Sequence, residues 1–400
     1  MSAGRARPSR RRVLLGAAGA ALSASLARPR PLAAQGAAAQ IALLRRGVNL
    51  SHWLSWEGRQ PVTAADAAMI RRAGFDHVRL PVDPEYLGWN PRADGAAKRM
   101  LVDFPRLDRA LRLLIDAGLA VIVSFHARED TRDQIELKQQ FQDAWVEYWQ
   151  ALARRYAGEP PGRLIFALMN EPQYYVRGAA RWHQHQQRAV QAVRAEDPRR
   201  WLALAGMGGS GLDYIERTGV IADPASFYVF HFYEPYLVTH FGAGWEPFTK
   251  EPAAQVTKIL YPSSEMNSAA AVVRMGPQRA QAEKLVRDYI DRPWNAETVD
   301  ARIAVAAAWA RRAGVALMCT EFGVLRTKID PASRFRWLAD VRRALERHGI
   351  GWSVWDYADL FGIAAARGEA ETLGDGAVVP KDPLNPRREF DPPALAALGL

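Results

Sequence analysis

The clearest sign of the fold is a single stretch, Arg312-Ala313-Gly314-Val315-Ala316-Leu317-Met318-Cys319-Thr320-Glu321-Phe322-Gly323. Glycine directly after a basic turn is a common helix stop, and Gly314 has that position. The next residues, 315–320, carry no charge, which is typical of a strand buried on both faces of a parallel sheet. Glu321 follows this strand at once. The same helix stop precedes two other apolar runs, at Arg72-Ala73-Gly74-Phe75 and Asp116-Ala117-Gly118-Leu119.

Short β-rich runs alternate with longer amphipathic segments along most of the chain. Eight runs are predicted to be strands: 47–50, 77–82, 119–125, 164–169, 201–205, 227–232, 315–320 and 351–355. Eight strands joined by helices favour a single α/β fold, the (β/α)8 TIM barrel, over an open doubly wound sheet. The interval from Phe241 to Asn295 is too long for one loop and one helix. We therefore expect an insertion after strand six, at the rim of the barrel mouth.

Length and composition agree with one large globular domain. The chain has 400 residues, of which 49% are hydrophobic and 24% are charged. These ordinary values argue against a disordered, collagen-like or coiled-coil protein. The single cysteine, Cys319, excludes an intramolecular disulfide and any zinc or iron–sulfur site built from several cysteines.

The formal net charge of +10 is concentrated at the N-terminus. Residues 1–40 contain seven arginines and no acidic residue, which leaves only +3 for the rest of the chain. A nucleic-acid-binding protein needs basic residues gathered on a folded face, so the charge gives little support for that class.

The arginines instead resemble a twin-arginine export signal. The segment Ser9-Arg10-Arg11-Arg12-Val13-Leu14-Leu15 precedes an apolar stretch that ends near Ala27 and is short for a membrane-spanning helix. We expect residues 1–39 to be the signal peptide and cleavage region, cut between Ala34 and Ala39. Residues 40–400 would then be one catalytic barrel, periplasmic or secreted, monomeric and free of the membrane. A basic tail or an uncleaved anchor is the alternative.

In a (β/α)8 barrel the reacting groups come from the C-terminal ends of the strands. Two predicted strand ends carry a glutamate after a long uncharged run, Glu171 after strand four and Glu321 after strand seven. These strands lie on different sides of a barrel, so the two carboxylates would meet across its mouth. A pair of carboxylates facing each other is the arrangement that a glycosidase needs.

Six segments together resemble glycoside hydrolase family 5, the cellulase-type family of a retaining (β/α)8 clan. They are Arg46-Gly47-Val48-Asn49-Leu50, Val78-Arg79-Leu80-Pro81, Asn170-Glu171-Pro172, His231-Phe232-Tyr233, Glu321-Phe322-Gly323 and Trp352-Ser353-Val354-Trp355. The resemblance spans residues 45–360. It implies a hydrolase of β-linked polysaccharide that needs no cofactor and no metal, most closely an endo-β-1,4-glucanase. A β-mannanase or β-1,3-glucanase remains an alternative of the same fold, and a non-catalytic carbohydrate-binding barrel is an alternative of another class.

The resemblance also implies roles for the two glutamates. Glu171 would be the general acid/base, with a raised pKa, and Glu321 would be the nucleophile, with carboxyl groups about 5 to 5.5 Å apart. Arg79 and Tyr233 would hold Glu321 in its charged form and orient it. A slip in strand register would bring Tyr228 or Tyr236 to that place instead.

The remaining substrate contacts follow from the same resemblance. Asn170 would bind the 2-hydroxyl of the sugar whose bond is cut, and Trp355 would stack on a sugar face. His126 and His231 would line the same cup, unless they are ordinary core histidines. Candidate groove aromatics are Trp53, Trp56, Trp89 and Trp245. The segment from His52 to Trp56 departs from a common family form with small residues, so the subsites for the non-reducing end are expected to differ.

Two motifs suggest other chemistry. The loop Gly206-Met207-Gly208-Gly209-Ser210-Gly211 fits the G-x-G-x-x-G pattern, and it is the basis of a third hypothesis, an NAD-dependent oxidoreductase. No acidic residue stands at the end of the following strand, which argues against that hypothesis. His183 and His185 could suggest a metal, but residues two apart on a helix point to different faces.

Overall fold

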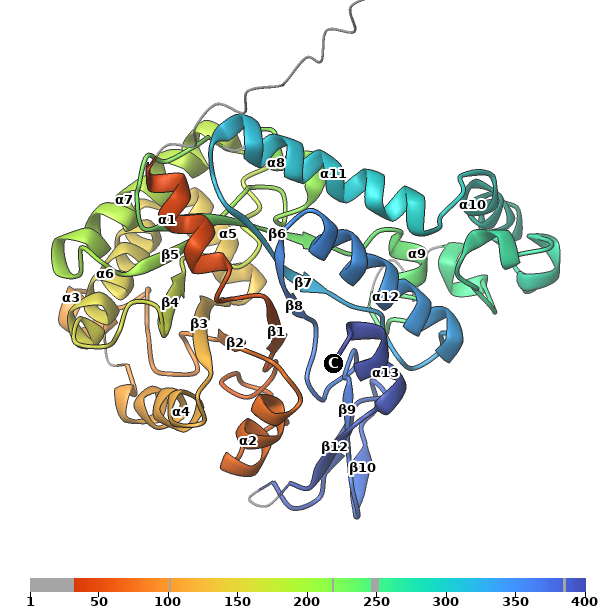
Figure 1. Cartoon of the computed structure of the whole chain (residues 1–400), viewed down its shortest axis with the longest axis horizontal. Helices are drawn as coiled ribbons and strands as arrows, with labels where there is room; N and C mark the ends of the chain where they lie inside the picture. The colour runs from red at the N-terminus through yellow and green to blue at the C-terminus, as the bar shows by residue number, and fades with distance from the viewer. Residues whose placement is uncertain (1–31, 101, 218, 246–251, 384–385) are drawn as a thin grey trace, which may run out of the picture. The chain divides into compact units, whose positions relative to one another are not determined.

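The computed structural model describes residues 32–400 except 101, 218, 246–251 and 384–385. Eight parallel strands form a closed barrel in chain order, in which the eighth strand pairs with the first (Figure 1). The strands are β1 (Arg46–Asn49), β2 (His77–Val82), β3 (Ala120–Phe125), β4 (Leu164–Ala167), β5 (Trp201–Ala205), β6 (Ser226–Phe232), β7 (Leu317–Phe322) and β8 (Gly351–Val354). The predicted (β/α)8 barrel is confirmed, and predicted and observed strand ends differ by at most two residues.

Helices follow the strands and cover the outside of the barrel. The longer ones are α2 (Ala64–Arg72), α4 (Phe104–Asp116), α5 (Glu129–Leu137), α6 (Gln139–Tyr156), α7 (Gly178–Glu196), α11 (Ala296–Ala313) and α12 (Pro331–Arg347). Three single-turn helices are α3 (Ala96–Arg99), α8 (Leu212–Ile215) and α9 (Tyr236–Thr239). The expected helix stop at Gly314 is present, with φ 69° and its N–H bonded to the Ala310 carbonyl. Among the described residues, no helix has both the length and the apolar character that crossing a membrane requires.

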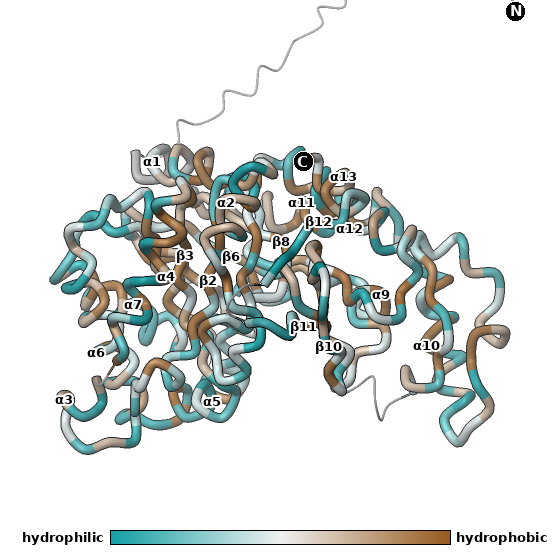
Figure 2. Tube along the Cα trace, turned by 90° about the horizontal axis from the view of Figure 1, so that it is seen from below, coloured by the Kyte–Doolittle hydropathy of each residue, from teal (hydrophilic) through white to brown (hydrophobic). Residues whose placement is uncertain are grey.

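Alternate strand residues divide the core into two parts. Outward residues such as Val121 and Phe166 pack against the helices, whereas inward residues such as Ile122 and Ile165 fill the barrel. Figure 2 shows hydrophobic stretches running through β2 and β3. This alternation explains why the strands read as continuous apolar runs, because both of their faces are buried.

The N-terminal helix α1 (Leu32–Ile41) packs against the interior of the barrel. Ala37 and Ile41 are buried, and they belong to the same apolar cluster as inward strand residues. The Gln40 side chain donates a hydrogen bond to the Gly162 carbonyl at 3.4 Å. The twin-arginine segment lies outside the described residues. The position of the cut stays a prediction, but a cut after Ala39 would remove a packed part of α1.

The predicted insertion after strand six is present. It contains three 3-10 turns, η1 (Pro252–Gln255), η2 (Ser263–Glu265) and η3 (Ala270–Val272), and the helix α10 (Arg279–Asp291). Tyr261 fixes the insertion to α12, because its N–H donates to Ser333 Oγ at 3.0 Å and its Oη donates to Asp340 Oδ2 at 2.8 Å. Figure 1 shows α10 lying beyond α9 and α12. Tyr261 therefore anchors the insertion on an outer helix, and the predicted rim position holds for Trp245 near the start of the insertion.

The chain after β8 forms elements that the sequence did not indicate. Strand β9 (Ala364–Ala366) pairs with β12 (Arg388–Phe390), and β10 (Ala370–Thr372) pairs with β11 (Val378–Pro380), before the final helix α13 (Pro392–Leu398). Strands of three residues are too short to show a period in the sequence. A buried ion pair between Arg388 and Asp66 ties β12 to α2.

Candidate active site

A cavity of about 510 Å³ opens at the C-terminal ends of the barrel strands. Residues that follow β1, β3, β4, β6 and β8, and Glu321 near the end of β7, meet in its wall, as the barrel fold requires. Seven of the predicted site residues are in contact there or with one another: Arg79, His126, Asn170, Glu171, His231, Tyr233 and Glu321. Trp355 lines the same cavity.

Glu321 lies where β7 departs from regular pairing. Phe230 of β6 pairs with Cys319, but His231 pairs with Glu321, so Thr320 is an extra residue in β7. A bulge of this kind turns the side chains around it. Glu321 lies within β7 (Leu317–Phe322) rather than after it, where the sequence predicted it. The next position, Gly323, requires glycine. A Cβ there would lie 2.0 Å from the Trp355 carbonyl oxygen and would collide with it.

The Glu321 carboxylate is only 4% exposed and is held from two sides. Arg79 Nη1 contacts its Oε1, and Tyr233 Oη donates a hydrogen bond to its Oε2 at 3.0 Å. Both residues that the sequence analysis assigns to Glu321 therefore contact it. The alternative tyrosines do not replace Tyr233, since Tyr228 bonds to the Gly219 carbonyl and Tyr236 follows on α9.

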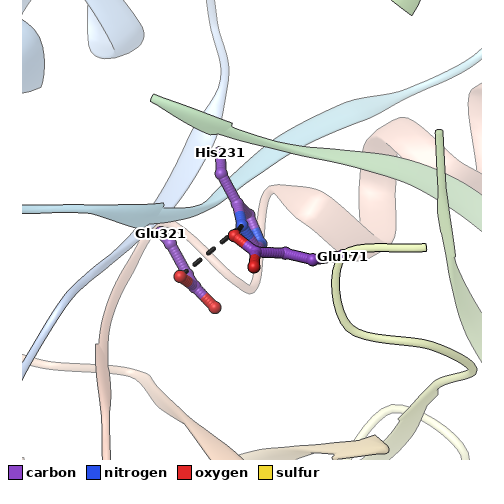
Figure 3. A group of neighbouring side chains, drawn as sticks. All are labelled: Glu171, His231 and Glu321. Atoms are coloured by element: carbon purple, nitrogen blue, oxygen red, sulfur yellow. Dashed lines mark hydrogen bonds and ion pairs between the residues drawn. The ribbon is translucent and has the colours of Figure 1, made fainter. Parts of the chain in front are cut away.

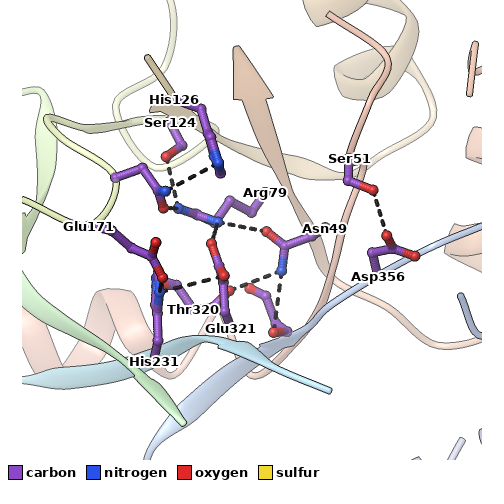
Figure 4. Close-up of polar contacts among 12 residues, drawn as sticks. Asn49, Ser51, Arg79, Ser124, His126, Glu171, His231, Thr320, Glu321 and Asp356 are labelled. Carbon is purple, nitrogen blue, oxygen red and sulfur yellow. Dashed lines mark hydrogen bonds and ion pairs between the residues drawn. The ribbon is translucent and has the colours of Figure 1, made fainter. Parts of the chain in front are cut away.

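Arg79 is itself fixed by side chains from β1, from β3 and from the segment after β4. It donates to Asn49 Oδ1 at 2.9 Å, to Ser124 Oγ at 2.9 Å and to Asn170 Oδ1 at 2.7 Å (Figure 4). Asn49 and Ser124 were not predicted to be site residues. Both residues lie near the C-terminal ends of predicted strands, and this position could have indicated them. Asn49 lies beside Arg79 in the pairing of β1 with β2. The guanidinium is thus positioned before any substrate binds.

Glu171 follows β4 in a backbone conformation that only a few non-glycine residues adopt, with φ 45°. The loop after β5 supports this conformation, because Gly208 and Gly209 donate backbone hydrogen bonds to the Gln173 and Pro172 carbonyls at 3.0 and 3.2 Å. Gly208 is the second glycine of the G-x-G-x-x-G motif, and Gly209 is the residue after it. Two of their N–H groups are therefore used inside the protein, and the motif holds the Glu171 loop rather than a dinucleotide.

The two glutamates face each other with His231 between them (Figure 3). His231 Nδ1 lies 3.0 Å from Glu171 Oε1 and 3.5 Å from Glu321 Oε2. One carboxylate oxygen of each glutamate and a nitrogen of His231 all lie within 4.8 Å of one another. Such a close approach of two carboxylate oxygens favours a retaining pair, because the carboxyl groups of an inverting pair stand about 6.5 to 9.5 Å apart to leave room for water.

The electrostatic surroundings of Glu171 differ from our expectation. Burial raises the pKa of Glu171. The hydrogen bond from His231 and the positive charges of Arg132 and Arg79 together lower it by more than burial raises it, so the pKa lies below the usual value. Arg132 Nη1 is 3.6 Å from Glu171 Oε2. The raised pKa that was predicted for Glu171 is therefore not found.

The other predicted sugar-binding residues surround the pair. Asn170 Nδ2 lies 3.2 Å from His126 Nε2, and the His126 ring stacks on Trp355 with centroids 5.8 Å apart. Burial lowers the pKa of His126 to about 3, so this ring is neutral near neutral pH. The peptide bond between Trp355 and Asp356 is cis. These side chains offer neutral hydrogen-bonding groups and an aromatic face, which is what a sugar ring binds.

The four tryptophans predicted to line a substrate groove lie in different environments. Trp245 lines the cavity as expected. Trp89 does not belong to a groove, because it is 1% exposed, packs in the core and donates to the Ala144 carbonyl. Trp53 and Trp56 do not line the cavity either. Trp53 packs against the core, and Trp56 is 59% exposed and rests edge-on against Tyr86. Their predicted substrate contact would need a groove that extends beyond this cavity.

The Glu171, His231 and Glu321 side chains are also close enough to share a metal ion. Their donors are already engaged, because Arg79 and Tyr233 bind Glu321 and His231 donates to Glu171. The guanidinium groups of Arg79 and Arg132 add positive charge beside the carboxylates, which opposes a cation there. His185 Nδ1 contacts the Tyr174 hydroxyl at 2.6 Å, and among the described residues neither His183 nor His185 belongs to a group of three or more side chains that could hold a metal ion.

Comparison with known proteins agrees with this geometry. The family model described as cellulase (glycosyl hydrolase family 5) matches residues 37–360. Endoglucanase C of Acetivibrio thermocellus is 27% identical over 329 residues, which cover 79% of this chain and 92% of that protein. Endoglucanase 3 of Fibrobacter succinogenes is 23% identical and is matched over 80% of this chain and half of its own length.

Solved structures share the fold. An endoglucanase superimposes with a TM-score of 0.69 at 20% identity, covering 91% of this chain and all of that one. Thermotoga maritima Cel5A in complex with cellobiose superimposes with a TM-score of 0.67 at 20% identity, covering 90% of this chain and 99% of that chain.

Proposed function

The chain belongs to glycosyl hydrolase family 5, and from this membership we propose that it is a retaining endo-β-1,4-glucanase in which Glu321 is the nucleophile and Glu171 the general acid/base. The observation that carries the proposal is the approach of the two carboxylates within 4.8 Å in a cavity at the barrel mouth. The relatives named endoglucanase support a β-1,4-glucan as the substrate.

In the first step Glu321 attacks the anomeric carbon while Glu171 gives a proton to the departing glycosidic oxygen. The bond between that carbon and oxygen breaks, and an ester bond to the Glu321 oxygen forms. Arg79 and Tyr233 position the attacking carboxylate, and they share its negative charge until the ester forms. Asn170 faces the reacting sugar beside them, where a hydrogen bond to the 2-hydroxyl would strengthen in the transition state.

In the second step water hydrolyses the ester. Glu171, now ionised, removes a proton from the water as the oxygen attacks the anomeric carbon, and Glu321 leaves as a carboxylate. The site favours the ionised form of Glu171 that this step needs, because His231 and Arg132 stabilise its charge. Two inversions at one carbon retain its configuration.

The first step instead requires protonated Glu171. Its side chain is 32% exposed, so water still reaches the carboxylate in the free protein. A bound glucan would cover this face, and further burial acts to raise the pKa of a carboxyl group. We therefore propose that substrate binding shifts Glu171 toward its acid form.

Products will test the reaction class and the substrate. We expect NMR to show β-configured reducing ends immediately after cleavage of cellohexaose, and viscosity of a soluble β-1,4-glucan to fall before many reducing ends appear. Glucomannan, mixed-linkage glucan and β-1,3-glucan serve as comparison substrates, since β-mannanase and β-1,3-glucanase activity are the rivals. Products that first appear in the α configuration would contradict a retaining pair.

We also propose that the protein leaves the cytoplasm by the twin-arginine route. Replacing Arg10 and Arg11 together by lysine should leave the protein in the cytoplasm of a bacterium that has this pathway, because the export machinery recognises the paired arginines. Activity and immunoblots of the cell fractions measure the outcome. Unchanged export of the variant would contradict the route without affecting the enzyme assignment.

We propose further that one chain is the active unit. One copy supplies all the residues that line the cavity described above. Light scattering on the active fraction should give the mass of a monomer, and activity found only in a dimer fraction would contradict this.

A further inference from the structure

The family match ends at residue 360, but the chain after that residue supplies part of the cavity wall. Asp375, between β10 and β11, lines the same cavity as Glu321 and Trp355. The hairpin β10–β11 thus brings a side chain to the candidate site from outside the segment that the family model describes.

Arg59 fixes this hairpin to the barrel. Its Nε and Nη2 donate to Asp359 Oδ2 at 3.0 and 2.8 Å, and its Nη1 donates to Asp375 Oδ2 at 2.7 Å. The next residue, Gln60, donates from its side chain to the Val378 carbonyl of β11 at 3.2 Å. One short segment after β1 therefore holds the loop after β8 and the hairpin in fixed positions.

Asp375 retains capacity for a ligand. Burial raises the pKa of Asp375. Hydrogen bonds from the Ala377 N–H and from Arg59 together lower it by more than burial raises it, so the pKa lies below the usual value. Ala377 donates to Oδ1 and Arg59 donates to Oδ2, which leaves each carboxylate oxygen a second lone pair. The side chain is 36% exposed. A pre-positioned carboxylate of this kind can accept two hydroxyl groups from one sugar.

The position of Asp375 along the cavity indicates which sugar it would bind. It lies with Arg59 and Asp359, on the side formed by the segments after β1 and β8, and Trp355 belongs to the same side. Trp245 follows β6, which β7 separates from β8 in the barrel. The family resemblance assigns the segment after β1 to the non-reducing-end subsites, and this is where the sequence departs from the common family form.

We propose that Asp375 is a specificity-determining residue that binds the hydroxyl groups of a glucan unit on the non-reducing side of the cut, beyond the unit at Trp355. The β10–β11 hairpin then forms a subsite of this chain that the family segment alone does not contain. This inference rests on the proposed endo-β-1,4-glucanase function. It predicts that chain length on the non-reducing side controls binding, while the chemical step is unaffected.

The test measures kcat and KM for cellotriose to cellohexaose, and the bond that is cut, using substrates labelled with 18O at the reducing end. Asp375→Ala should raise KM for cellohexaose about tenfold with kcat nearly unchanged, the loss typical of a hydrogen bond to a charged group. It should also move the preferred cut by at least one unit toward the non-reducing end. Asp375→Asn keeps an acceptor for Arg59 and should give a smaller change in the same direction.

Glu371→Ala is the matched control, because Glu371 is an exposed acid on β10 that does not line the cavity. It should keep the KM and the cleavage pattern of the unchanged protein. An unchanged KM and pattern in both Asp375 variants would overturn the inference. So would an equal fall of kcat at every chain length together with a lower melting temperature, since that indicates a structural role. Failure of the unchanged protein to cut any cellodextrin would instead overturn the proposed function.

Discussion

Replacing Glu321 by glutamine is expected to lower kcat/KM on a β-1,4-glucan by about four orders of magnitude or more, or roughly 5.5 kcal/mol of transition-state stabilisation. The amide has nearly the same shape but is a poor nucleophile, so no ester forms with the anomeric carbon. Steady-state kinetics on cellohexaose would measure the loss. Glutamine can still accept a hydrogen bond from Arg79 or Tyr233, and the melting temperature should therefore change much less than the activity.

A second variant separates the nucleophile from other roles of Glu321. Glu321→Ala leaves space beside the anomeric carbon, where a small anion such as azide can attack. Azide should then restore turnover of an aryl cellobioside and yield an α-glycosyl azide, because only one inversion takes place. Wild-type rates in Glu321→Gln, or a β-glycosyl azide from Glu321→Ala, would show that Glu321 is not the nucleophile.

Replacing Glu171 by glutamine should give a loss that depends on the leaving group. On a β-1,4-glucan, kcat/KM should fall about a thousandfold, because the departing sugar oxygen needs a proton. On an aryl cellobioside with an acidic phenol the first step needs no proton. Release of that phenol should therefore begin with a rapid burst, followed by slow turnover as the ester awaits an activated water.

The two substrates thus act as controls for each other. Azide should speed the slow phase of Glu171→Gln and give a β-glycosyl azide, the opposite configuration to that from Glu321→Ala. Equal losses on the glucan and on the activated aryl substrate would contradict the acid/base role. Stopped-flow measurement of phenol release, together with NMR of the azide product, distinguishes these outcomes.

The barrel could be predicted from local sequence patterns. Each strand is a short uncharged run, and the stop at Gly314 and the stretch that leads to Glu321 are readable without any distant contact. Strand order then follows from the handedness and shortness of the connections. The same locality placed Glu171 and Glu321 at the mouth, because strand ends of a (β/α)8 barrel converge there.

Several features of the site needed contacts between distant parts of the chain. The bulge at Thr320 depends on the pairing of β7 with β6, so β7 alone did not indicate it. Asn49 and Ser124 bind Arg79 only because the closed sheet places three strands side by side. Trp89 is a core residue for the same reason, although its position after β2 was compatible with a groove.

The sequence by itself therefore determined the barrel, the two glutamates and their family, since apolar period and strand-end polarity are properties of neighbouring residues. Only the tertiary structure decided the separation of the carboxylates, the support of Glu171 by a glycine loop and the arrival of Asp375 at the cavity. Those depend on distances between segments that can be 316 positions apart, as Arg59 and Asp375 are. Distances of that kind are set by closure of the sheet and packing around it.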